Sequence, residues 1–155
     1  MGTYRATVTW RARDGEDFTR GRYSRAHEWQ FDGGVRVPAS AAPSHVPLPY
    51  AEPGAVDPEE AYVAALSSCH MLFFLHLAGK RGFAVAAYED QAFGEMAKRD
   101  DGREWIVRVT LRPDVTFAGG KSPSPADIER LHREAHDLCF LANSVLTEVL
   151  VDRPA

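Results

Sequence analysis

One segment of this 155-residue chain constrains its fold more than any other: residues 57–82, DPEEAYVAALSSCHMLFFLHLAGKRG, the longest periodic apolar run. Its first residues carry the signals of a helix start, because Asp57 can cap the helix, Pro58 suits the first helical position, and Glu60 completes a capping box. At the other end, Lys80 and Arg81 suit a helix C-terminus, and either Gly79 or Gly82 can take the left-handed closing conformation. The segment therefore predicts one long helix.

The apolar residues of this helix recur at steps of three and four. They are Tyr62, Ala65, Leu66, Cys69, Leu72, Phe73 and Leu77. This spacing predicts a buried stripe with Cys69 pointing inward. Met71 and Phe74 widen the apolar surface beyond the stripe, so the helix needs a second covering surface, and a partner subunit is its simplest source.

Length and charge exclude several classes of protein. Residues 61–79 contain no Asp, Glu, Lys or Arg, but Ser67 and His76 interrupt them, and the run is shorter than the roughly 20 strongly apolar residues of a membrane span. We therefore expect a buried core helix and no membrane.

A net charge of −4 without a clustered basic face argues against nucleic acid as a partner. The length suits a single domain over residues 1–155, and the first ten residues lack the apolar core of a signal peptide, so a cytoplasmic location is expected.

The remainder of the chain alternates strand and turn signals. Asp32-Gly33-Gly34 and Asp100-Asp101-Gly102 are typical hairpin turns, because glycine accepts a positive φ at no steric cost. Ser124 and Pro125 start a second helix. Strands are predicted over residues 3–10, 23–31, 35–37, 85–98, 104–117 and 145–151, with a proline-rich loop over residues 39–56. This order predicts an α+β domain in which two main helices cover an antiparallel sheet.

The chain has two cysteines, Cys69 and Cys139, and each has a histidine nearby, His70 and His136. A permanent disulfide is not expected in a reducing compartment, so three interpretations compete. Both cysteines can be small core residues, which is the usual fate of a buried free thiol. They can join His136 and His70 in a metal site, although His70 points about 100° away from Cys69 on a helix. They can also form a redox pair, in which a sulfenic acid on one thiol is captured by the other thiol as a disulfide.

Two motifs that contain the cysteines bear on this choice. The first is PEE at residues 58–60 followed by AALSSC at residues 64–69, and the second is AHDLCFLANS at residues 135–144. Together they resemble the OsmC-like family, which includes osmotically inducible protein C and the organic hydroperoxide resistance proteins. The resemblance covers most of the chain. It implies an OsmC-like fold that forms an intertwined homodimer, with its sites at the subunit interface.

The resemblance also implies roles for individual residues. Cys69 matches the peroxidatic cysteine and Cys139 the resolving cysteine, and Glu59 matches a glutamate ten residues before the first cysteine. The family's thiolate-stabilising arginine falls within residues 21–25, where Arg25 is favoured and Arg22 is the alternative. A buried thiol needs a cation of this kind because burial raises its pKa, and arginine keeps its proton and offers a planar fork.

The function implied by the resemblance is a cysteine-based peroxidase that reduces organic hydroperoxides in oxidative stress defence, with hydrogen peroxide as a second candidate substrate. It requires an external dithiol reductant and no cofactor or metal. Phe140 stands where many family members carry proline, which marks a divergent branch. Two alternatives stay open: a non-catalytic module of the same fold that binds an apolar small molecule, and a metal-binding protein that uses Cys69, Cys139 and His136.

The position of Glu59 raises a question of distance. In a continuous helix, ten residues separate Glu59 from Cys69 by about 15 Å along the axis, which is too far for one site. Either the helix starts late or is broken, or Glu59 serves Cys69 of the partner subunit across a dimer interface. We expect the dimer, with two sites that are each built from both chains.

Overall fold

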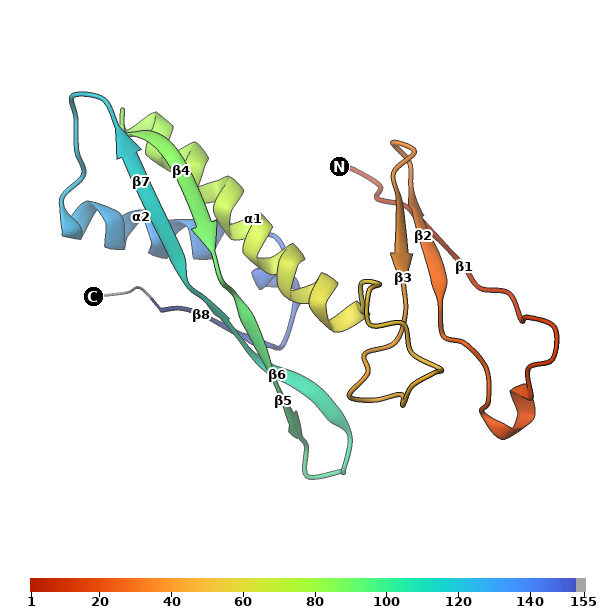
Figure 1. Ribbon diagram of the computed structural model, residues 1–155. Helices are drawn as coiled ribbons and strands as arrows, with labels where there is room; N and C mark the ends of the chain where they lie inside the picture. Colours follow the sequence, from red (N-terminus) through yellow and green to blue (C-terminus); the bar gives the residue numbers. More distant parts are fainter. Residues whose placement is uncertain (153–155) are drawn as a thin grey trace. The chain divides into compact units, whose positions relative to one another are not determined.

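The computed structural model describes residues 1–152 of the chain (Figure 1). The chain divides into two units, one over Met1–Ala61 and a second that starts at Tyr62. A single domain over residues 1–155 stays a prediction.

The first unit contains a three-stranded antiparallel sheet. Its strands are β1 (Ala6–Thr9), β2 (His27–Phe31) and β3 (Arg36–Ala39), in the order β1-β2-β3. The predicted turn at Asp32-Gly33-Gly34 joins β2 to β3, and Gly34 has the positive φ, 86°, that the turn requires. Strands β1 and β2 are shorter than predicted, because the segment that precedes β2 folds as an irregular loop around a short 3₁₀ helix, η1 (Phe18–Arg20), whereas β3 extends two residues beyond the predicted end.

Helix α1 (Pro58–Lys80) begins where the sequence predicts. Its capping box is formed: the Glu60 backbone N–H donates to the Asp57 carboxylate at 2.7 Å, and the Asp57 N–H donates to the Glu60 carboxylate at 3.3 Å. At the other end, Gly82 has a φ of 75°, and the Phe83 N–H donates to the Ala78 carbonyl at 3.0 Å. These bonds supply partners for groups that a helix end leaves unpaired.

The second unit contains five strands and a second helix, α2 (Pro125–Leu138), which begins at the predicted Ser124 cap. The strands are β4 (Ala84–Asp90), β5 (Phe93–Lys98), β6 (Glu104–Leu111), β7 (Pro113–Ala118) and β8 (Glu148–Val151). Each long strand predicted in the second hairpin is therefore two strands, and β4 pairs with β7 while β5 pairs with β6, both antiparallel. The division occurs where the Asp90 carboxylate accepts the Arg112 backbone N–H at 2.6 Å, a bond that a continuous ladder would give to a carbonyl.

Strand β8 pairs with β6 in parallel, which differs from the antiparallel sheet that we predicted. The reason is the connection, because β8 follows α2 and returns to the sheet through a helical crossover. The α+β class with two main helices and largely antiparallel pairing is confirmed.

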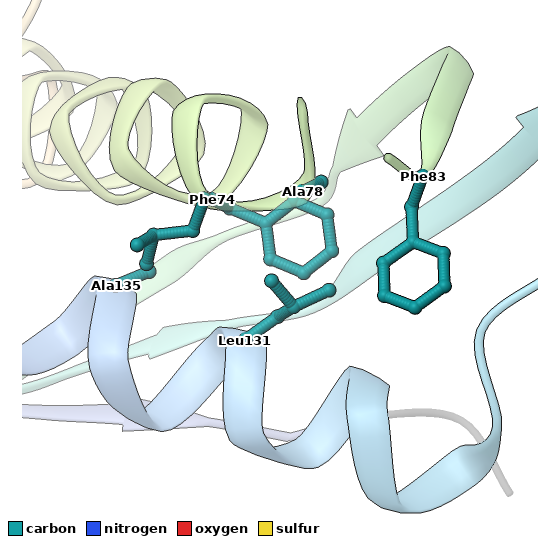
Figure 2. Packing of buried hydrophobic residues seen from close by; sticks show 6 residues of the cluster. Phe74, Ala78, Phe83, Leu131 and Ala135 are labelled. Carbon is teal, nitrogen blue, oxygen red and sulfur yellow. The ribbon is translucent and has the colours of Figure 1, made fainter. Parts of the chain in front are cut away.

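Helix α2 packs on α1 to form the larger core of the second unit. Figure 2 shows Phe74 and Ala78 of α1 pointing toward Leu131 and Ala135 of α2, with Phe83 beside them. Side chains of β4 and β7 pack against the same cluster. The core therefore fixes which side of α1 lies inside this unit.

The predicted buried stripe of α1 is confirmed at Leu66 and Leu77 and is wrong at Leu72. The buried side chains are Leu66, His70, Phe74, Leu77 and Ala78. Cys69 is only half-buried, and Leu72, which belonged to the predicted stripe, is 60% exposed. Because α1 is apolar around most of its circumference, packing against α2 and the strands, rather than its own periodicity, selects the buried side.

Helix α1 is also long and apolar enough to cross a membrane by length and composition alone. Its polar side chains, however, bond within the second unit. The Ser67 hydroxyl donates to the Asp90 carboxylate at 2.5 Å, and His70 Nε2 lies 3.0 Å from His132 Nδ1. These partners favour the core helix that we predicted.

Candidate functional site

The structure brings the two cysteines together. Cys69 lies midway along α1, and Cys139 is the residue at which α2 ends. Both are free, and their thiols form a hydrogen bond. The thiol pair is therefore one of the contacts between α1 and α2.

The two thiols differ in their surroundings. Cys139 is 1% exposed, whereas Cys69 is half-buried. Burial raises the pKa of Cys139 to about 11. The Ala142 N–H, which donates to Cys139 Sγ at 3.4 Å, opposes this effect, and the hydrogen bond that the Cys139 thiol donates to Cys69 adds to it. Cys139 is therefore a protonated thiol at neutral pH.

The end of α2 is held by Asn143. Its side-chain amide donates to the carbonyl oxygens of Asp137 and Cys139 at 2.9 and 3.0 Å. Such bonds satisfy carbonyl groups that lack partners at a helix C-terminus. Cys139 is thus fixed at its backbone as well as buried at its side chain.

An aromatic pair flanks the thiols. Phe73 follows Cys69 by one helical turn, and Phe140 follows Cys139 directly. Their rings meet edge to face, with centroids 5.0 Å apart, and Phe140 is 69% exposed. The pair presents apolar surface to solvent beside the cysteines.

Arg25 and Arg22, the two candidate arginines, lie in the loop before β2. Arg22 is exposed, whereas Arg25 is half-buried. The Arg25 guanidinium donates through Nη1 to the carbonyls of Gly21 and Tyr23, at 2.9 and 2.5 Å, and lies over the Tyr23 ring. Arg25 is therefore the arginine with a defined orientation.

Glu59 lies in the first turn of α1, beside His45, whose Nδ1 is 3.8 Å from the carboxylate. Within residues 1–152, Glu59 forms no ion pair with Arg25. Because α1 is continuous from Pro58 to Lys80, the late start and the broken helix considered above are both wrong. Glu59 is about 15 Å along the helix axis from Cys69 of its own chain.

A buried histidine pair lies on the other side of α1. His70 and His132 stack with ring centroids 5.4 Å apart, and His132 also stacks on Phe74 at 4.4 Å. Burial, with a smaller electrostatic effect of His136, lowers the pKa of His70 to about 4. The His70 side chain is therefore uncharged at neutral pH. We did not predict a role for His132, although its place next to Leu131 on the apolar side of α2 is a signal of burial.

The histidines do not build a metal centre with the cysteines. Across residues 1–152, no three His, Cys, Asp or Glu side chains converge in a way that could hold a metal ion. His70 is buried, which we did not predict, and as the next residue of a continuous helix it points about 100° around the axis from Cys69, as predicted. The metal-binding alternative therefore has no support from the geometry.

A family model described as OsmC-like protein matches residues 51–152. The chain belongs to the OsmC-like family. This OsmC-like chain is similar to a solved OsmC-like protein of unknown function from Vibrio cholerae O1 biovar eltor, with 48% identity and a TM-score of 0.96 over 99% of this chain and 100% of that chain. A comparison with curated proteins found no match.

Two more distant structures share the fold. The OsmC-like chain matches an organic hydroperoxide resistance protein OsmC from Legionella pneumophila with 16% identity and a TM-score of 0.70, over 100% of both chains. It matches the organic hydroperoxide resistance protein OhrB of Bacillus subtilis with 20% identity and a TM-score of 0.65, over 97% of this chain and 98% of that chain. The predicted OsmC-like fold is confirmed.

Proposed function

We propose that the chain is a cysteine-based peroxidase that reduces organic hydroperoxides to alcohols in oxidative stress defence. The observation that carries this proposal is the hydrogen-bonded pair of free thiols, Cys69 and Cys139. Family membership supports it, and relatives at low identity are organic hydroperoxide resistance proteins. The cytoplasm, where thiols are kept reduced, is the compartment that suits this chemistry.

The chemistry takes two steps. The Cys69 thiol loses its proton, and the thiolate attacks the outer oxygen of the hydroperoxide. The O–O bond breaks, the alkoxide takes up a proton in place of the one that the thiol released and leaves as the alcohol, and Cys69 becomes a sulfenic acid. The Cys139 sulfur then attacks the Cys69 sulfur, and the sulfenic hydroxyl leaves with the thiol proton as water. An external dithiol reduces the resulting disulfide and restores both thiols.

The different burial of the thiols supports this order of events. Cys69 is the more exposed of the two, so a peroxide can reach it. Cys139 is buried and protonated, a state that keeps it from competing for peroxide. Its side chain interacts with that of Cys69, as a resolving thiol requires.

Arg25 and Glu59 complete the proposed site. Arg25 would stabilise the Cys69 thiolate and the peroxide oxygen with its charge and its planar donors. Glu59 would orient Arg25 and accept a hydrogen bond from the peroxide. Since about 15 Å of continuous helix separate Glu59 from Cys69 of the same chain, we assign Glu59 to the site of the partner subunit in an intertwined homodimer. The exposed Leu72 on α1 is consistent with a surface that a second chain covers.

The Phe73 and Phe140 rings favour an apolar substrate. They would bind the alkyl or aryl part of an organic hydroperoxide, whereas hydrogen peroxide has no apolar part to bind. We therefore expect cumene hydroperoxide to react faster than hydrogen peroxide.

The test is titration of free thiols after one equivalent of cumene hydroperoxide or hydrogen peroxide. Wild type should lose both thiols rapidly, Cys69→Ser should lose none, and Cys139→Ser should accumulate a sulfenic acid that dimedone traps. Slow loss of thiols at equal rates in all three proteins would rule out the proposed peroxidase activity. The remaining hypothesis would then be a non-catalytic module that binds an apolar small molecule beside the Phe73 and Phe140 rings.

A further inference from the structure

The Arg25 guanidinium is held on one side by its own loop. Its central carbon lies 3.7 Å from the centre of the Tyr23 ring, which is a close cation–π contact. Its Nη1 donates to the carbonyls of Gly21 and Tyr23. These bonds use two of the five N–H donors of the fork, so one side is anchored and the other donors share a fixed direction.

Tyr23 is in turn held by two further aromatic side chains. The Phe18 ring lies 4.5 Å from the Tyr23 ring and the Trp10 ring lies 5.5 Å from it, between centroids. The Trp10 Nε1–H donates to the Ser24 carbonyl at 2.8 Å. We call Trp10, Phe18 and Tyr23 the aromatic stack. It gives Tyr23 a defined position, which a single exposed ring on a loop would not have.

The backbone of Arg25 is fixed independently of the aromatic stack. Its N–H donates to the Tyr50 carbonyl at 2.8 Å, and its carbonyl lies 2.7 Å from His27 Nδ1. Because Trp29 Nε1 can only donate, its 3.0 Å bond to His27 Nε2 leaves the His27 proton on Nδ1, which donates to the Arg25 carbonyl. The side chain of Arg25 is supported by the Gly21 and Tyr23 carbonyls and by the rings of Tyr23, at 3.7 Å, and Tyr50, at 6.0 Å. Of the two rings, that of Tyr23 is the closer and is the one that a substitution at position 23 removes.

We propose that Tyr23 is a positioning residue of the proposed peroxidase, whose ring holds the Arg25 guanidinium in a single orientation. This inference rests on the proposed function. The same aromatic stack could instead serve only to close the loop between β1 and β2. The two roles predict different effects of a non-aromatic side chain at position 23. If Tyr23 positions Arg25, the substitution slows the oxidation of Cys69 only when Arg25 is present. If Tyr23 only closes the loop, any slowing does not depend on Arg25.

The test compares Tyr23→Leu with Tyr23→Phe, and uses Tyr4→Leu as a control because Tyr4 is a 90% exposed tyrosine of the same unit. The rate of Cys69 oxidation by cumene hydroperoxide should fall about 10-fold in Tyr23→Leu, because a guanidinium that samples several orientations stabilises the thiolate less. It should stay within about twofold of wild type in Tyr23→Phe, which keeps the ring face, and in Tyr4→Leu.

A double-variant cycle separates positioning from loop closure. Tyr23→Leu should slow the reaction in wild type but not in an Arg25→Gln background, since Tyr23 then has no guanidinium to hold. Equal slowing in both backgrounds, or a Tyr23→Phe variant as slow as Tyr23→Leu, would overturn the inference and leave the peroxidase intact. A wild type whose thiols do not react with peroxide would instead overturn the proposed function, and this inference with it.

Discussion

Helices α1 and α2 begin in the same way but bury their side chains differently. Both start with a capping box, Asp57 with Glu60 in α1 and Ser124 with Asp127 in α2. In α2 one side is buried and the others are charged or exposed. In α1 one side is buried, but an exposed side also carries apolar residues, of which Leu72 is the largest exposed one.

This difference shows that the start of a helix is determined by residues close together in the sequence, whereas the side that a helix buries is determined by residues distant in the sequence. A capping box joins residues three positions apart, so its sequence signal is complete in itself. The buried side depends on the neighbours that the helix meets. Consequently Cys139, on the more polar helix, is the buried thiol, and Cys69, on the apolar helix, is the more exposed one.

The largest expected effect on stability compares a substitution on the buried side of α1 with one on its exposed side. Phe74→Ala should lower the free energy of unfolding by about 3–5 kcal/mol, because the ring is fully buried and contacts His132, Tyr88 and Phe117. Urea unfolding of Leu72→Ala is the matched control, with an expected loss below about 1 kcal/mol in a monomer. A larger loss that depends on protein concentration would show that a second chain covers Leu72. A loss below about 1 kcal/mol in Phe74→Ala would contradict the assignment of the buried side.

The second prediction concerns the buried thiol at the end of α2. Because the pKa of Cys139 rises from 9.0 to about 11, its thiolate at pH 8 is about 100-fold rarer than in the unfolded chain. In a Cys69→Ser variant, which leaves Cys139 as the only thiol, iodoacetamide should react at least about 100-fold more slowly in buffer than in 8 M urea. Comparable rates in the two solvents would mean that Cys139 is open to solvent.

The third prediction uses the His70–His132 contact between the helices. The pKa of His70 is about 4 in the folded chain and near 6.5 when unfolded, so between these pH values the unfolded state binds more protons and stability falls as pH falls. From pH 7 to pH 5, wild type should lose about 2 kcal/mol more unfolding free energy than His70→Phe, which keeps a ring in the same place. Parallel pH dependences of wild type and variant, measured by urea unfolding, would rule out His70 as the source.

The smallest effects concern the feature that the helices share. Asp57→Ala and Ser124→Ala should each lower the free energy of unfolding by about 1 kcal/mol, because each removes the side chain that accepts a backbone N–H at a helix start. The restoring controls are Asp57→Ser and Ser124→Asp, which keep an acceptor at the cap. Thermal unfolding of the four variants measures the effect, and alanine variants as stable as wild type would show that neither cap contributes.

Much of the fold could be predicted because its signals are local. The two helix starts and the turn at Asp32-Gly33-Gly34 each depend on a few consecutive residues, and the structure confirms all three. The division of the second hairpin and the parallel strand β8 could not be predicted. The first depends on the bond between Asp90 and the Arg112 backbone, and the second on a pairing across α2, both distant in sequence.

The candidate site was predictable to a different degree. The resemblance to a family, rather than the spacing of residues, implied that Cys69 and Cys139 act as a pair, and the structure joins their thiols. Arg25 was also favoured over Arg22. A role for Tyr23 was not predicted, because a tyrosine in a charged loop is compatible with many structural roles. Contacts between side chains of a loop become visible only when the loop's conformation is known.

The parallel pairing of β8 with β6 has a consequence during synthesis of the chain. Strands β5 and β6 follow each other and can pair as soon as both have left the ribosome, whereas Arg108 of β6 bonds Glu148 of β8 across 40 residues. Closing that longer loop costs more conformational entropy, and it has to wait until α2 has been translated. Until then the outer edge of β6 is open, and an open strand edge is a template for pairing with other nascent chains. The arrival of β8 ends this vulnerable stage.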